Sequence, residues 1–89
     1  MADATQHDHV VVTYNGADQS IRYEPHERVD AVLKRALDLF NIQANRHLYG
    51  LFTEANVELP DGESMEKAGV RPGQLLILRQ STVRGGSPR

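Results

Sequence analysis

A change of hydrophobic period at Pro25 restricts this chain to folds in which one helix packs against strands. Before Pro25, Ile21 and Tyr23 alternate with polar residues, as in a strand that has one solvated face. After Pro25, apolar residues recur at the spacing of one helix face; they are Val29, Val32, Leu33, Ala36, Leu37 and Phe40. This spacing predicts an amphipathic helix over residues 29–40 whose apolar stripe lies in the core.

The two ends of this predicted helix are marked unequally. Asn41 suits the left-handed position that follows a helix, and Ile42 can fold back as the hydrophobic partner of the last turn. At the other end, Glu27 and Arg28 are poorer N-caps than Ser, Thr, Asp or Asn. The sequence therefore predicts where the helix ends but offers no reason for where it begins.

A β-hairpin is predicted before the helix. Residues 9–14, "HVVVTY", are rich in β-branched side chains, and Asn15-Gly16 follows them directly. Asn-Gly between apolar segments is the strongest short-range signal for a hairpin turn. A second strand over residues 19–23 then pairs antiparallel with the first, with the length of the loop left open.

Two short strands are predicted after the helix. Residues 48–53, "LYGLFT", have the composition of a strand, in which Gly50 marks a bulge or a bend. Residues 57–59, "VEL", follow as a short fourth strand that ends at a proline. Together these segments extend the sheet that the hairpin begins.

A turn-rich segment separates these strands from the last one. Pro60-Asp61-Gly62 predicts a turn, with proline setting φ and Gly62 taking a positive φ. Ser64 caps a short helical turn that ends before Gly69, and Val70 is placed to fill the core below it. This segment is therefore predicted to be a loop that contributes to the core.

The last predicted strand covers residues 74–79, "QLLILR", after a turn at Pro72-Gly73. Consecutive apolar residues are typical of a central strand, so we place it next to the first strand. The predicted fold class is α+β, a β-grasp with a mixed sheet of four to five strands and one helix packed across one face. The register of this strand stays open, because a slip of one residue exchanges its two faces.

Composition limits the classes of function. The 89 residues fit one domain, and the chain has no cysteine, which excludes disulfides, thiolate metal sites and thiol nucleophiles. The formal net charge of -2 provides no basic field for nucleic acid or anionic lipid, and no segment resembles a signal peptide or a membrane span. We expect a cytoplasmic protein whose partners are proteins.

No set of residues predicts catalysis or metal binding. His7-Asp8-His9 offers two imidazoles, but we assign it to a disordered leader that lacks further ligands. His26 and His47 are isolated histidines near the ends of elements. Since the sequence has no paired carboxylates, no Ser-His-Asp set and no phosphate-binding loop, we expect neither enzymatic activity nor a cofactor.

The order of these features resembles ubiquitin. "VVVTYNG" is similar to the first hairpin of that family, "VDAVLKRALDLF" to its helix and "LPDGESMEKAGV" to its Leu-x-Asp-Gly turn with a buried aliphatic residue after it. "LLIL" and "VRGG" are similar to its last strand and its Leu-Arg-Gly-Gly tail. The resemblance covers residues 9–86, which is nearly the whole chain.

The resemblance implies a protein modifier. In that family, an activating enzyme adenylates the last glycine with ATP, and the glycine passes as a thioester to a conjugating enzyme and then to an amine of a target protein. The matching residues are Gly86 as the point of conjugation, with Arg84 and Gly85 recognised in the tail. Seven residues from Gln80 to Gly86 span up to about 23 Å, and glycines fit a narrow channel because they have no Cβ.

Ser87-Pro88-Arg89 departs from the family pattern, because it occupies the carboxylate that must be activated. We predict a propeptide that a protease removes between Gly86 and Ser87, as in bacterial ubiquitin-like modifiers that are processed by a JAB-type zinc metalloprotease. The predicted organisation is a leader over 1–8, a domain over 9–80, a conjugation tail over 81–86 and a propeptide over 87–89.

Three further points follow from the resemblance. The aliphatic patch by which ubiquitin binds partners has possible counterparts in Tyr49 and in one pair of the last strand, either Leu75 and Ile77 or Leu76 and Leu78. Only Lys34 and Lys67 are present, so we expect conjugation of single units. A modifier is expected to be a monomer, so that its tail stays free. Two alternatives remain open: a non-covalent ubiquitin-like adaptor, and a sulfur carrier that forms a Gly86 thiocarboxylate.

Overall fold

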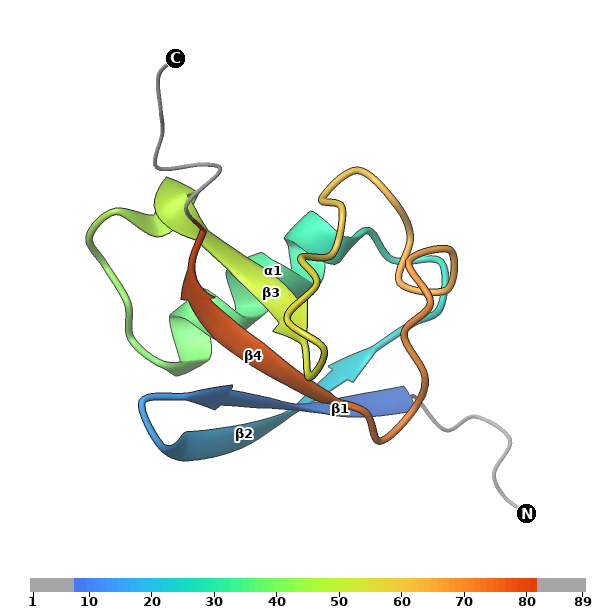
Figure 1. Ribbon diagram of the computed structural model, residues 1–89, viewed down its shortest axis with the longest axis horizontal. Coiled ribbons are helices and arrows are strands. Elements are labelled where there is room, and N and C mark those ends of the chain that lie inside the picture. Colours follow the sequence, from blue (N-terminus) through green and yellow to red (C-terminus); the bar gives the residue numbers. More distant parts are fainter. Residues whose placement is uncertain (1–7, 82–89) are drawn as a thin grey trace.

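The structure is a computed structural model, and it describes residues 8–81 (Figure 1). Within these residues, four strands and one α-helix follow in the predicted order. Their bounds are β1 Asp8–Tyr14, β2 Ala17–Tyr23, α1 Val29–Leu39, the 3₁₀ turn η1 Arg46–Leu48, β3 Tyr49–Thr53 and β4 Leu75–Gln80. β1 begins at Asp8, so Asp8 belongs to the sheet and not to a leader.

The predicted hairpin is confirmed, with a loop of two residues. Asn15 and Gly16 have φ values of 54° and 84°, and Tyr14 is paired with Ala17. Positive φ at both central residues is the type I′ geometry, whose twist matches that of the flanking strands. The tight turn allows β2 to begin at Ala17, two residues before the predicted start.

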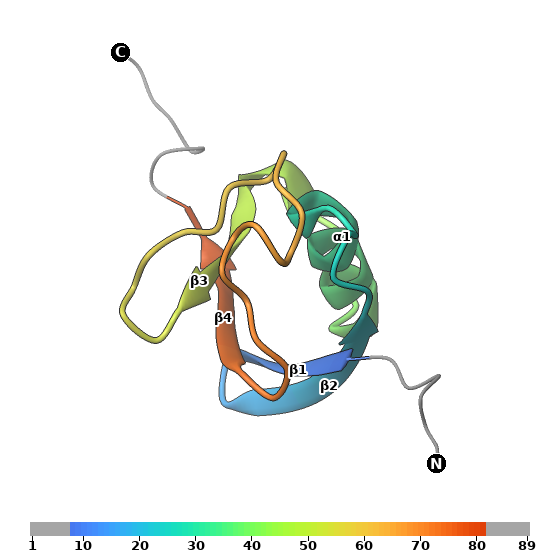
Figure 2. The same ribbon diagram turned by 90° about the vertical axis from the view of Figure 1, so that its right-hand side faces the viewer.

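The sheet is mixed and has the strand order β2-β1-β4-β3. β4 pairs in parallel with β1 and antiparallel with β3, so the last strand is central and next to the first, as predicted. Figure 2 shows that α1 lies across one face of the sheet. This arrangement confirms the α+β class, with four strands and one helix.

The core lies between α1 and the covered face of the sheet. All the helix positions of the predicted stripe up to Leu37 are buried, and Phe40 packs against the core as a partly buried side chain. Alternate residues of each strand face the helix. The buried strand residues that do so are Val10, Val12, Ile21, Tyr23, Tyr49, Leu51, Leu76 and Leu78.

Helix α1 ends in the predicted manner. Asn41 has a φ of 58°, and its N–H donates to the Asp38 carbonyl at 3.1 Å. The N–H of Ile42 donates to the Leu37 carbonyl at 2.9 Å, and the Ile42 side chain is buried in the core. These two hydrogen bonds form a Schellman motif, which satisfies the last carbonyls of the helix.

Helix α1 begins without any side-chain cap at Arg28, which explains why the sequence offers no local signal. Instead, the N–H of Val29 donates to the Glu63 carbonyl at 2.8 Å, and the N–H of Asp30 donates to the Asp61 carbonyl at 3.2 Å. The first N–H groups of a helix need such acceptors. The loop after residue 59 supplies them, so the cap comes from a distant part of the chain.

The same loop is held in return by the segment before the helix. The N–H of Met65 donates to the Glu27 carbonyl at 2.7 Å, and the N–H of Glu66 donates to the Pro25 carbonyl at 2.9 Å. Met65 is fully buried, and Val70 fills the core as predicted. Burial of an apolar side chain of this size stabilises the fold by about 1.5–3 kcal/mol. The turn-rich segment is therefore a structural part of the fold.

Three predictions about the later segments are wrong. Residues 57–59 form no strand, because Glu58 makes only an isolated bridge with Phe52. Gly50 marks neither a bulge nor a bend, since it pairs with Arg79 in an unbroken register. Gly62 is not among the residues with positive φ, although the turn forms, with the Glu63 N–H donating to the Pro60 carbonyl at 3.3 Å.

Candidate protein-binding face

The register of β4 decides which of its side chains lie on the face of the sheet opposite the helix. Leu76 and Leu78 are buried beneath the helix, whereas Leu75 and Ile77 are half-buried on the opposite face. The parallel pairing of β4 with β1 sets this choice, because Leu76 lies beside Val12, which also faces the core. Of the two pairs that the sequence left open, Leu75 and Ile77 therefore point away from the helix.

The uncovered side of the sheet carries a mainly apolar set of residues that we call the outer face. It comprises Val11, Thr13, Phe52, Leu75, Ile77 and Arg79. Thr13, Ile77 and Phe52 are direct neighbours across three adjacent strands. The outer face is therefore a continuous surface over β1, β4 and β3.

Phe52 and Arg79 form the most distinctive contact on the outer face. The guanidinium carbon of Arg79 lies 3.8 Å from the centroid of the Phe52 ring, and the Asn56 side-chain carbonyl accepts a hydrogen bond from Arg79. A cation over an aromatic face is attracted by the ring quadrupole. Phe52 is only 6% exposed. Next to Ile77, the apolar surface therefore ends at the positively charged guanidinium of Arg79, which lies over the Phe52 ring.

Tyr49 does not belong to the outer face. It is 9% exposed and lies in the core, where its ring contacts Tyr14 at a centroid distance of 6.1 Å. The reason is the alternation along β3: Tyr49 shares the core side with Leu51, and Phe52 takes the outer side. Phe52 and Arg79 are not predicted from the sequence, although Phe52 must take the outer side once its neighbour Leu51 is placed in the core.

The residues predicted for conjugation and cleavage, Arg84, Gly85, Gly86 and Ser87, lie outside the described residues. The structure does define the point from which they extend. Ser81 is 3% exposed, its N–H donates to the Leu48 carbonyl at 2.8 Å, and its hydroxyl donates to the Glu58 carboxylate at 2.8 Å. These bonds fix Ser81, the last described residue, next to β3.

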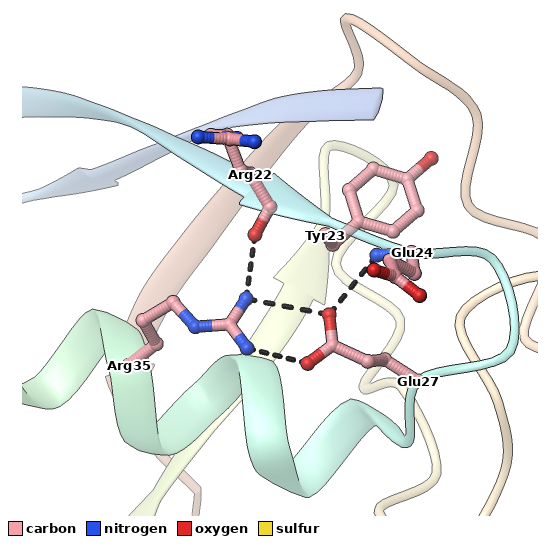
Figure 3. Close-up of a pocket in the computed structure, with 5 residues that line it drawn as sticks. All are labelled: Arg22, Tyr23, Glu24, Glu27 and Arg35. Carbon is pink, nitrogen blue, oxygen red and sulfur yellow. Dashed lines mark hydrogen bonds and ion pairs between the residues drawn. The ribbon is translucent and has the colours of Figure 1, made fainter. Parts of the chain in front are cut away.

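A second feature is a shallow pocket of about 400 Å³ between β2 and α1 (Figure 3). The Glu27 carboxylate receives hydrogen bonds from both terminal nitrogens of Arg35 and one from the Glu24 N–H at 3.0 Å. Arg35 also donates to the Arg22 carbonyl at 2.5 Å. The charged groups thus bond to one another and to the backbone, so we interpret this cluster as a structural link between α1 and β2.

This link predicts a pH-dependent stability. Hydrogen bonding to Arg35 holds the pKa of Glu27 below its ordinary value. The stabilisation is therefore complete above the ordinary pKa of a glutamate and is lost as the pH falls through the lower pKa of the folded state. We expect Glu27→Gln to lower the free energy of unfolding by about 1 kcal/mol at neutral pH, since the partner Arg35 is 41% exposed and solvent screens the pair.

Urea unfolding of the wild type and of Glu27→Gln at a series of pH values measures this difference. The two proteins should converge in strongly acidic solution, where Glu27 is protonated in both the folded and the unfolded state. Glu54→Gln, at an exposed position, is the matched control and should show no such dependence. A difference between wild type and Glu27→Gln that stays constant with pH contradicts the assignment.

Neither a metal site nor a transmembrane helix occurs in the described part of the chain. Residues 8–81 contain no group of three or more His, Asp or Glu side chains placed to hold a metal ion. Among the same residues, no helix combines the length and the apolar character that a membrane span requires. His9, His26 and His47 are exposed.

Comparison with known proteins identifies the fold. No family model and no curated protein matches the sequence. Among solved structures, the ubiquitin-like domain of an Arabidopsis thaliana protein has a TM-score of 0.72 at 16% identity, over 93% of this chain and 87% of that one. The EccD5 ubiquitin-like domain from Mycobacterium xenopi has a TM-score of 0.73 at 16% identity, over 85% of this chain and 96% of that one.

A third similar structure is that of ATBAG1 in complex with HSP70, with a TM-score of 0.73 and 14% identity. The match covers 88% of this chain but only 42% of that protein, so the chain spans less than half of its length. At these identities the comparisons show the fold alone. The protein has the ubiquitin-like β-grasp fold.

Proposed function

We propose that this protein is a cytoplasmic ubiquitin-like modifier that is conjugated through Gly86. A JAB-type protease hydrolyses the bond between Gly86 and Ser87, as in bacterial modifiers of this kind. The freed carboxylate attacks the α-phosphate of ATP on an activating enzyme, and pyrophosphate leaves. A cysteine of the enzyme displaces AMP to form a thioester, and after transfer to a conjugating enzyme an amine of a target protein displaces the thiol to form an isopeptide bond.

The observation that carries this proposal is the place of Arg84-Gly85-Gly86 relative to the fold. Ser81, the last described residue, is anchored to Leu48, and Gly86 follows five residues later in the sequence. Five extended residues span up to about 17 Å, which is enough to insert a carboxylate into a partner while the folded body stays outside. Since the chain has no cysteine, the thioester sulfur belongs to the partner enzymes.

The outer face supports a second candidate, a non-covalent adaptor. Half-buried aliphatic side chains at Leu75 and Ile77, bordered by Arg79, suit a partner that presents an apolar side chain next to a carboxylate. An adaptor needs only this face and makes no use of Gly86. The modifier needs both, because its enzymes and targets must also recognise the folded body.

The intact mass of the protein recovered from its native cells separates the two candidates. Loss of Ser87-Pro88-Arg89, together with adducts of higher mass that disappear in Gly86→Ala, supports the modifier. Retention of Arg89 in every molecule, with no adducts, contradicts the modifier and leaves the adaptor. A chain that ends at Gly86 with sulfur in place of one carboxylate oxygen would instead identify a sulfur carrier.

A further inference from the structure

The chain contains four asparagines, and all four lie at exposed positions in the left-handed backbone region. Their φ values are 54° for Asn15, 58° for Asn41, 59° for Asn45 and 68° for Asn56. Asparagine tolerates this region because its short polar side chain can bond locally. The four residues are therefore alike in exposure and backbone conformation, but they differ in the residue that follows, because glycine follows Asn15 alone.

The side chains of these asparagines are also held to different degrees. The side-chain carbonyl of Asn41 accepts a hydrogen bond from the Gln43 amide at 2.9 Å, and that of Asn56 accepts one from Arg79. Among the described residues, neither Asn15 nor Asn45 has a hydrogen-bond partner for its side chain. The carboxamide of Asn15 can therefore rotate about its side-chain bonds, and water has access to it.

The main-chain nitrogen of Gly16 is accessible as well. The two-residue turn, at the left of Figure 1, pairs Tyr14 with Ala17, and the N–H of Gly16 donates no hydrogen bond to a described residue. A Cβ atom placed on Gly16 would have no neighbour within 4 Å, so nothing crowds this nitrogen. A main-chain nitrogen and an unbonded carboxamide thus lie in adjacent, exposed residues.

We propose that Asn15-Gly16 is a site of spontaneous deamidation, and that the hairpin controls its rate. The Gly16 nitrogen gives its proton to hydroxide and attacks the side-chain carbonyl carbon of Asn15. A carbon–nitrogen bond forms between these two atoms, the bond to the side-chain nitrogen breaks, and ammonia leaves with a proton taken from water. The product is a cyclic succinimide. Water then opens this ring at either carbonyl, which yields aspartate or isoaspartate.

The geometry of the turn opposes ring closure. The Gly16 nitrogen reaches the side chain only when the Asn15 Cα–C bond rotates to bring this nitrogen next to Cβ. In a type I′ turn the ψ angle at this position is about 30°, which directs the nitrogen away from Cβ. Ring closure therefore requires the turn to open, with loss of the Tyr14–Ala17 pairing and of the contact between the Tyr14 and Phe40 rings, whose centroids lie 5.4 Å apart.

Formation of isoaspartate damages the hairpin. Isoaspartate carries the main chain through the side-chain carboxyl group, which adds a methylene group to the backbone of the turn. A two-residue loop matches the twist of its strands through the φ values of its two residues, so the longer backbone no longer fits. Because β1 lies between β2 and β4, the damage reaches the middle of the sheet. This inference depends on neither candidate function.

Mass spectrometry of the full chain, incubated in mildly alkaline buffer with and without guanidinium chloride, tests the proposal. Trypsin separates Asn15 from the other asparagines, because Arg22 and Arg35 lie between them. Replacement of NH₂ by OH raises the mass of the peptide, and electron-transfer fragmentation distinguishes isoaspartate from aspartate. In denaturant we expect Asn15 to react at least about tenfold faster than the other three, since Gly16 has no Cβ to hinder attack. Without denaturant we expect its rate to fall at least about tenfold.

Two variants locate the opening that limits the rate. Phe40→Leu weakens the packing on Tyr14 next to the turn and should speed the reaction of Asn15 several-fold in the absence of denaturant. Phe52→Leu is the matched control, because it removes the other phenylalanine ring of the chain, which lies on the outer face two strands away from β1. Its rate should equal that of the wild type. Tyr14→Leu removes the same ring contact and serves if circular dichroism shows that Phe40→Leu does not fold.

Three results overturn the proposal. The first is a reaction of Asn15 in denaturant that is no faster than that of the other asparagines, which would remove the chemical basis of the site. The second is an equal rate with and without denaturant, which would show that the turn does not oppose ring closure. The third is equal acceleration by the two phenylalanine variants, which would place the control in global unfolding and not in the hairpin.

Discussion

Leu76→Asp is expected to unfold the domain. Leu76 is fully buried in the central strand, beside Val12 of β1 and beneath α1. The substitution removes a large apolar side chain and places a carboxylate among the buried apolar side chains of the core. The combined cost is at least about 4 kcal/mol, a large part of the 5–15 kcal/mol that stabilises a typical domain. Far-UV circular dichroism and urea unfolding measure it.

Ile77→Asp, one position along, is the matched control. Ile77 is half-buried on the outer face, so its carboxylate stays in contact with water. We expect a folded protein whose free energy of unfolding falls by about 1 kcal/mol, and in which the partner binding that we propose for the outer face is lost. Equal destabilisation by both substitutions would show that the register of β4 is wrong.

This pair of positions also illustrates the limit of sequence reasoning. Leu75, Leu76, Ile77 and Leu78 are all apolar, so both alternating sets fit a core and the pattern cannot choose between them. The run does predict that β4 is central, because consecutive apolar residues are typical of a central strand, although in the structure the helix covers only one of its two faces. The choice of faces depends on pairing with β1, which is a tertiary interaction.

The two ends of α1 also differ in this respect: local interactions determine one end, and a tertiary interaction determines the other. Asn41 and Ile42 terminate the helix by local hydrogen bonds, which is why the sequence predicts this end. The first turn is capped by carbonyls of Asp61 and Glu63, more than thirty residues along the chain. No local pattern can report a cap that forms only when the loop is already in place.

The candidate site was predictable in part. The resemblance to ubiquitin places an aliphatic patch on β4 but leaves open whether Leu75 and Ile77 or Leu76 and Leu78 form it. The prediction for Tyr49 is wrong because it rests on the composition of β3 and not on its parity. The stacking of Arg79 on Phe52 joins residues that are distant in sequence, and its geometry depends on the register of β3 with β4. Such contacts are not visible in the sequence of either strand.

The position of the C-terminal carboxylate is expected to determine completely whether the activating enzyme can adenylate the chain. We compare three chains, ending at Gly85, at Gly86 and at Arg89, in an ATP–pyrophosphate exchange assay with the activating enzyme from the same cells. Only the chain that ends at Gly86 should support exchange. Ending at Gly85 withdraws the carboxylate by about 3.3 Å, and ending at Arg89 leaves Gly86 within a peptide bond and fills the channel with larger side chains.

The expected loss of ATP–pyrophosphate exchange follows from the geometry that bond formation requires. Reacting atoms must approach to about 3–3.5 Å, and a displacement of even about 1 Å can reduce the rate about a hundredfold. Because the fold is anchored at Ser81 in all three chains, differences in exchange report the tail and not the domain. Equal exchange by the chains ending at Gly86 and Arg89 would contradict the modifier proposal. Addition of the processing protease should make the Arg89 chain active only if Gly86–Ser87 is the bond that it hydrolyses.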